Sequence, residues 1–171
     1  MFDMHKLECE YGDYSNGVGC SVKVEGGEPY LLLNLEMLYK LCKEKGLCGP
    51  HGDFTYIMFR NDHFHIFIVE LKSIKENSDK SLNSILDSSV EKFRNSLTAV
   101  NNFARQSLNI RDIGIKCYAV LVLPSHAINR IKALLSHFRM KFRSLREAGY
   151  EDGWITYCNC KIWNKTVPLM K

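Results

Sequence analysis

The strongest hydrophobic pattern in the chain is a nearly continuous apolar run that follows a short polar turn. Residues 64–71 carry apolar side chains on both faces of an extended segment, which is typical of a strand buried inside a layered domain. Asn61 and Asp62 suit a two-residue turn that needs positive φ at both positions. The pattern therefore predicts a β-hairpin in which Arg60 lies opposite His63, with the same register continuing along both strands.

The rest of the chain predicts helices that alternate with strands. Residues 113–123 form a second buried apolar segment, and short strands are expected within residues 1–27. Alternation over residues 154–163 predicts a last strand that packs at the edge of the sheet or forms a homodimer contact. Apolar residues recur at helical spacing in three segments: residues 29–45, 90–104 and 127–147.

These elements predict one α/β domain with a mixed central sheet flanked by helices. The hairpin supplies an antiparallel pair, and the helix that follows it returns the chain to a parallel neighbouring strand. A length of 171 residues with 46% hydrophobic composition fits one well-packed domain. We expect a core over about residues 28–124, with residues 1–27 and 125–171 as elaborations.

Charge and hydropathy narrow the class of protein. The net charge of +4 permits nucleic-acid binding without requiring it. No apolar run approaches the length of a transmembrane helix, and the first residues lack the cationic and apolar regions of a signal peptide. We therefore expect a soluble intracellular protein of the cytoplasm with no membrane partner, with the nucleus or a host-cell compartment as alternatives.

The cysteines indicate neither a disulfide framework nor a standard zinc module. Seven cysteines are an odd number, and no Cys-x-x-Cys pair occurs. Cys42, Cys48 and His51 are potential zinc ligands, but their spacing fits no common site. Most of the cysteines are expected to be reduced, small apolar residues.

An acidic pair is the most informative chemical feature. Glu70 and Lys72 fall on the same face of the apolar strand as Ile68, where unpaired charge is costly. The register predicted for the hairpin places Asp53 opposite Glu70, with Cβ atoms about 4.5–5.5 Å apart. Two carboxylates so placed repel each other unless a divalent cation binds between them.

This arrangement suits Mg²⁺ or Mn²⁺ and a phosphate substrate. Magnesium prefers one or two carboxylates together with water and phosphate oxygens, which Asp53 and Glu70 would complete. Lys72 would neutralise charge on the phosphate, or orient the attacking water. The alternative is that Asp53 only caps a turn and that Glu70 and Lys72 lie on a strand end in solvent.

The order of these residues resembles the PD-(D/E)xK nuclease superfamily. Gly52-Asp53 is followed by a strand, a turn, a strand ending in Glu70-Leu71-Lys72, a helix and another strand. The resemblance implies a restriction-endonuclease-like fold. It also implies that Asp53 and Glu70 bind the metal ion and that Lys72 is catalytic.

The resemblance covers about residues 28–124. The chain departs from the family pattern at His51-Gly52, since a proline often precedes the family's Asp. In the family, a helix before the Asp-bearing strand often carries a further Glu that contacts the metal or its water. Glu36 is the candidate for that role here, and the alternative is that it is one of several exposed helical acids.

A cationic stripe on the third predicted helix is a candidate nucleic-acid contact. Such a stripe can follow a phosphate backbone with salt-dependent affinity and little sequence selectivity. The alternative is a solvated face whose long side chains shield the core. The stripe consists of Lys132, Arg139, Arg143 and Arg146.

Together these features favour a magnesium-dependent nuclease that hydrolyses phosphodiester bonds, with DNA favoured over RNA. The first alternative is a non-catalytic nucleic-acid or protein interaction module that retains a nuclease-like fold. The second is a structural component of a larger complex. The sequence does not distinguish endonuclease from exonuclease activity.

Overall fold

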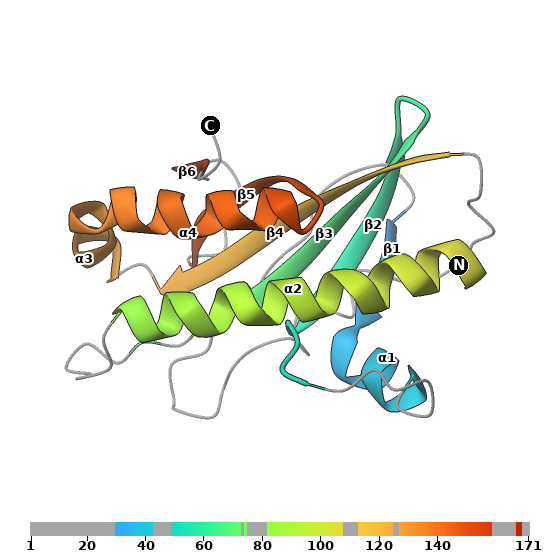
Figure 1. The fold of residues 1–171 in the computed structure, drawn as a ribbon, viewed down its shortest axis with the longest axis horizontal. Helices are drawn as coiled ribbons and strands as arrows, with labels where there is room; N and C mark the ends of the chain where they lie inside the picture. The colour runs from blue at the N-terminus through green and yellow to red at the C-terminus, as the bar shows by residue number, and fades with distance from the viewer. Residues whose placement is uncertain are drawn as a thin grey trace.

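The computed structural model describes most of the chain between residues 30 and 158 (Figure 1). The short strands expected within residues 1–27 lie outside the described residues, as do Cys48 and residues 159–163 of the expected last strand. The described residues are 30–42, 49–72, 74, 82–107, 113–124, 127–158 and 167–168.

The centre of the fold is a mixed six-stranded sheet with strand order β1-β2-β3-β4-β5-β6. Strands β1, β2 and β3 are successively antiparallel, whereas β3, β4 and β5 run parallel. This confirms the predicted antiparallel pair beside a parallel neighbour. The strands are β1 Tyr30–Asn34, β2 Phe54–Arg60, β3 His63–Leu71, β4 Gly114–Pro124, β5 Tyr150–Cys158 and β6 Val167–Pro168.

The hairpin of β2 and β3 has the predicted turn and register. Asn61 and Asp62 have φ angles of 51° and 58°. Arg60 lies opposite His63, and the ladder continues to the pair Phe54 and Val69. Side chains therefore alternate on β3 as expected, with Ile66, Ile68 and Glu70 on one face.

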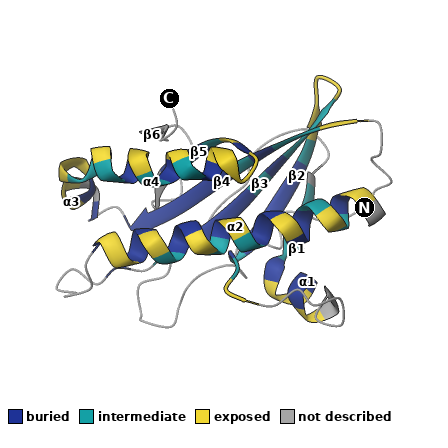
Figure 2. Ribbon diagram, in the orientation of Figure 1, coloured by how far each residue is buried: buried dark blue, intermediate teal, exposed yellow. Residues whose placement is uncertain are grey.

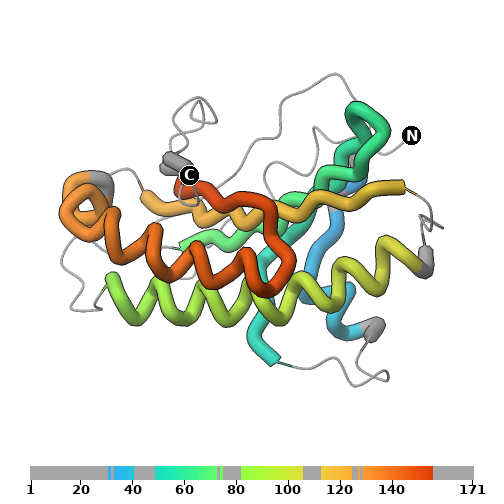
Figure 3. The backbone as a smooth tube through the Cα atoms, turned by 45° about the horizontal axis from the view of Figure 1, so that its top comes forward, coloured from blue at the N-terminus to red at the C-terminus, as the bar shows by residue number. Residues whose placement is uncertain are grey.

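The described helices pack against one face of the sheet. Figures 1 and 3 show α2 and α4 lying side by side in front of the strands, and Figure 2 shows buried residues along β3, β4 and the inner sides of these helices. One hydrophobic cluster joins Ile66 and Leu121 of the sheet to Phe93 of α2 and Phe142 of α4. The helices are α1 Leu35–Cys42, α2 Leu82–Ser107, α3 Ile128–Ala133 and α4 Leu135–Glu147.

The predicted helix over residues 29–45 is wrong in its first part. Strand β1 occupies that segment and pairs with β2, with Leu31 and Leu33 packed against the core cluster. The helix begins only at Leu35, because Asn34 accepts a hydrogen bond from the backbone N–H of Met37 (3.0 Å) and so caps the N-terminus. A short leucine run fits a strand as well as a helix, and pairing with β2 decides between them.

The predicted helix over residues 127–147 is divided in two. Leu134 has φ −111° and ψ 12°, and its N–H bonds to the carbonyl of Ile131, which ends α3. Helix α4 then continues to Glu147. Within the part of the chain that the structure describes, no helix combines the length and the apolar character needed to cross a bilayer.

Candidate active site

The segment that carries Asp53 is fixed to helix α2. The side-chain amide of Asn95 donates to the carbonyl of Pro50 (2.9 Å), and the N–H of Gly52 donates to the buried hydroxyl of Ser96 (2.8 Å). A Cβ atom at Gly52 would lie 3.0 Å from the carbonyl oxygen of Val69. Glycine therefore allows the backbone to approach β3 closely just before Asp53.

Asp53 is held by strand β3 and by the start of helix α1. Its N–H donates to the carbonyl of Val69 (2.9 Å), and its carbonyl accepts from the N–H of Leu35 at the start of α1 (3.2 Å). Its side-chain Oδ2 accepts a hydrogen bond of 2.6 Å from the N–H of Leu71. The carboxylate is thus positioned beside the end of β3, one residue beyond the ladder that begins at Phe54.

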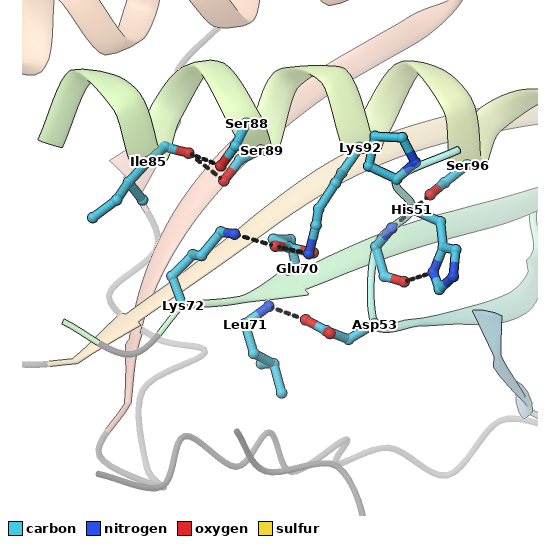
Figure 4. A network of polar contacts seen from close by, with 12 residues as sticks. His51, Asp53, Glu70, Leu71, Lys72, Ile85, Ser88, Ser89, Lys92 and Ser96 are labelled. Carbon is cyan, nitrogen blue, oxygen red and sulfur yellow. Dashed lines mark hydrogen bonds and ion pairs between the residues drawn. The ribbon is translucent and has the colours of Figure 1, made fainter. Parts of the chain in front are cut away.

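Glu70 is fully buried at the same end of β3 and contacts two lysines. Its Oε1 atom lies 2.8 Å from Nζ of Lys72 and 2.7 Å from Nζ of Lys92. Figure 4 shows Glu70 extending toward α2 between the two ammonium groups, with the Asp53 carboxylate directed at the main chain of Leu71. Glu70 is 0% exposed, while the side chains of Lys72 and Lys92 are 20% and 25% exposed. The site therefore reaches the surface through its lysines.

The two oxygens of the Glu70 carboxylate have different surroundings. Oε2 is buried and has no hydrogen-bond partner among the described residues. Burial raises the pKa of Glu70, and the charge of Asp53 raises it further, against the opposing effect of Lys72 and Lys92. A buried carboxylate oxygen without a partner is costly, and its presence calls for an explanation.

Lys92 is the site residue that sequence reasoning missed. It lies on α2, and Lys72 lies just after β3, so only the packing of the helix on the sheet brings them together. Burial acts to lower the pKa of Lys92, but the carboxylates of Glu70 and Asp53 outweigh it and the pKa is raised. Lys92 therefore carries a positive charge at neutral pH.

The donor set fits a hard divalent cation in part. Asp53 and Glu70 supply two carboxylates, and Glu70 Oε2 is a buried oxygen that a cation would satisfy. No cluster of three or more His, Cys, Asp or Glu residues suited to a metal ion occurs in the described ranges. Magnesium is commonly bound by one or two carboxylates with water and substrate phosphates, so two carboxylates are sufficient for a partial site.

Glu36 does not join this group. It lies in the first turn of α1 with its side chain 64% exposed, and it forms an ion pair of 2.7 Å with Lys40 one turn later. That hydrogen bond and the charge of Lys40 lower the pKa of Glu36. Its surroundings match the alternative of an exposed helical acid, so we do not retain Glu36 as a metal ligand.

The predicted cationic stripe is exposed but discontinuous. Lys132 lies on α3, before the break at Leu134, and the three arginines lie on α4. Helix α4 packs beside α2 through the Phe93 and Phe142 rings and through a hydrogen bond from Arg94 to Ser144 (3.0 Å). The three arginines of the stripe are therefore on a helix adjacent to the one that carries Lys92.

Comparisons with known proteins give no relative for this fold or site. No protein-family model matches the sequence, and neither a curated protein nor a solved structure matches it significantly. Assignment of a function therefore depends on the chemistry of the site itself.

Proposed function

We propose that the chain is a metal-dependent nuclease that hydrolyses phosphodiester bonds of nucleic acid, with the restriction-endonuclease-like arrangement that its motif order resembles. The observation that carries the proposal is the fully buried Glu70 carboxylate, whose Oε2 has no partner among the described residues while Oε1 contacts two lysines. Buried polar groups in folded proteins are normally paired, and a bound cation would supply the partner that Oε2 lacks among the described residues.

In this proposal Asp53 and Glu70 are the protein ligands of Mg²⁺ or Mn²⁺. The bound ion would act as a Lewis acid toward the phosphate and lower the pKa of a water. Hydrogen bonds from Leu71 to Asp53 and from Lys92 to Glu70 hold both carboxylates in place before any ligand arrives. Preorganised ligands of this kind reduce the reorganisation needed during the reaction.

Lys72 supplies the positive charge nearest to the end of β3. Its N–H bonds to the carbonyl of Val122 on β4 (2.9 Å), which fixes its main chain beside the site. Its partly exposed ammonium can contact a phosphate oxygen or hold the attacking water by a hydrogen bond. A lysine in that position stabilises the negative charge that develops on the phosphate.

The decisive experiment is a cleavage assay with the full chain. Labelled single- and double-stranded DNA and RNA are incubated with Mg²⁺ or Mn²⁺, and with EDTA as the metal-free control. We expect cleavage that requires metal and falls by more than about a hundredfold in Asp53→Ala and Glu70→Ala. The matched control is Asp87→Ala, since Asp87 is an exposed acid paired with Lys141.

Unchanged turnover in both variants would remove Asp53 and Glu70 from the mechanism. A non-catalytic interaction module is the second candidate, because Lys72 and Lys92 already offset part of the Glu70 charge without a cation. Binding of nucleic acid without turnover, across all four substrates and both metals, would favour that module.

A further inference from the structure

Lys92 contacts the Glu70 carboxylate from helix α2. It projects from α2 within a helical face that also carries buried Ser89, Phe93 and Ser96. Ser96 and Asn95 on the following turn anchor the segment before Asp53. The same stretch of α2 therefore contacts Glu70 directly and holds the segment that precedes Asp53.

The two lysines reach Glu70 from different elements. Lys72 follows Glu70 by two residues and is carried by the end of β3, whereas Lys92 reaches across from the helix layer. Both ammonium groups lie on the same atom, Oε1, at 2.8 and 2.7 Å. Because both contacts are made to Oε1, Oε2 is the oxygen that lacks a partner among the described residues and can bind a cation.

We infer that Lys92 is a positioning residue, which holds Oε1 of Glu70 and thereby presents Oε2 to the divalent cation. This inference rests on the proposed function. The two lysines then have different roles: Lys92 orients the metal ligand Glu70, and Lys72 acts on the phosphate. Partners that hydrogen-bond a ligating carboxylate are known to tune metal affinity about 10- to 100-fold.

Electrostatics alone predicts the opposite effect from positioning. If Lys92 were only a nearby positive charge, removing it would increase the attraction for a cation. If Lys92 orients the Glu70 carboxylate, removing it weakens metal binding even though a repulsive charge is lost. The sign of the change in affinity therefore separates the two roles.

The experiment measures Mn²⁺ binding to the full chain without nucleic acid, by electron paramagnetic resonance titrated to millimolar metal. We expect Lys92→Met to weaken Mn²⁺ binding by about tenfold or more. Lys92→Arg, which keeps the positive donor, should restore binding to within a few fold. Lys72→Met should bind Mn²⁺ as tightly as the wild type or more tightly, and Lys141→Met is the matched control for loss of an ion-paired lysine.

Mn²⁺ binding by folded Lys92→Met that equals or exceeds wild-type binding would overturn the inference while leaving the proposed metal site intact. If Lys92→Met does not fold, Lys92→Leu supports the same comparison, because it also removes both the charge and the hydrogen-bond donor. Absence of Mn²⁺ binding by the wild-type chain would instead overturn the proposed function together with the inference.

Discussion

The two faces of strand β3 bury very different groups. On the face opposite the described helices, the Phe67 ring stacks on Tyr56, Tyr118 and Trp154 at centroid distances of 4.4, 4.8 and 5.8 Å. On the face that packs under α2, Glu70 is buried among charged groups. These four aromatic residues form a row across β2, β3, β4 and β5. The charged cluster of Glu70, Lys72 and Lys92 is confined to one end of the sheet.

The aromatic residues of this row find their partners within the row and on the neighbouring strands. The rings stack on one another, and the hydroxyl of Tyr118 forms a hydrogen bond with His65 (3.0 Å). Such stacking contributes about 0.5–1.5 kcal/mol per pair beyond area burial. Glu70 retains a buried oxygen that no described residue satisfies. We therefore expect the aromatic face to contribute mainly to stability, and we propose that the charged end binds a ligand.

The largest expected effect is on turnover when Lys72 is replaced. Lys72→Met should lower the turnover number about 10²- to 10⁴-fold, because a positioned proton donor or charge at the phosphate is lost. Mn²⁺ affinity should not fall, since removal of a positive charge cannot weaken attraction for a cation. Steady-state cleavage kinetics with saturating Mn²⁺ measure this, with Lys40→Met as the control for an exposed lysine. Near-normal turnover would show that the Glu-Leu-Lys match is accidental.

Replacing Phe67 on the aromatic face should have the converse effect, a loss of stability without a loss of turnover. Phe67→Ala removes three ring contacts from a partly buried side chain and should lower the free energy of unfolding by about 2–3 kcal/mol. Cleavage per folded molecule should be unchanged. Urea unfolding measures the loss, and Phe59→Ala is the control because Phe59 is 41% exposed and should cost less than about 1 kcal/mol. A selective loss of turnover in folded Phe67→Ala would break the division between the faces.

Neutralising Glu70 should have a smaller and opposite effect on stability. Because the folded-state pKa of Glu70 is raised, mainly by burial, the folded protein holds this proton more tightly than the unfolded chain does. That stabilising contribution is complete below the ordinary pKa of 4.5 and is lost as pH rises through the folded-state pKa. At pH 7 we expect Glu70→Gln to raise the free energy of unfolding by about 1 kcal/mol.

This advantage of Glu70→Gln should shrink as the pH is lowered toward 4.5. Urea unfolding of both proteins across that range measures it, and Asp87→Asn serves as the control for an exposed acid. A loss of about 3 kcal/mol or more at pH 7 would mean that the two lysines stabilise the buried charge fully. Glu70 would then be a structural residue like those of the aromatic face.

Replacing arginines of the cationic stripe should have the smallest effect, a change in nucleic-acid affinity. Replacing Arg139 and Arg143 together by alanine should weaken binding evenly across nucleic-acid sequences and reduce the salt slope by about two units if both contact phosphates. Fluorescence anisotropy at several salt concentrations measures the slope. An unchanged slope would leave these arginines as solvated surface.

Much of the fold could be predicted from local signals in the sequence. Asn61 and Asp62 specify the hairpin turn, and the apolar run of β3 fixes which residues share a face. The first leucines of the expected helix form β1 instead, because strand pairing is decided by β2, which is distant in sequence. The break at Leu134 carried no glycine or proline to signal it.

The site was predictable only where it is local. Glu70 lies at the end of β3 and Lys72 directly follows that strand, and the hairpin register, continued one residue beyond Phe54, places Asp53 beside them. Lys92 could not be found in this way, because its contact depends on how α2 packs on the sheet. It lies one turn from the buried Ser89 and Ser96 and not from an apolar residue of the predicted helical face, so hydrophobic periodicity did not point to it.

Metal binding by Asp53 and Glu70 can be tested with a crystal of the protein that is soaked in Mn²⁺ and analysed by anomalous scattering. We expect an ion about 2.1 Å from a carboxylate oxygen of both Asp53 and Glu70, with Oε2 as the Glu70 ligand. Oε1 should still contact Lys92. An anomalous map at saturating Mn²⁺ with no ion at these carboxylates would contradict the claim that they form a metal site.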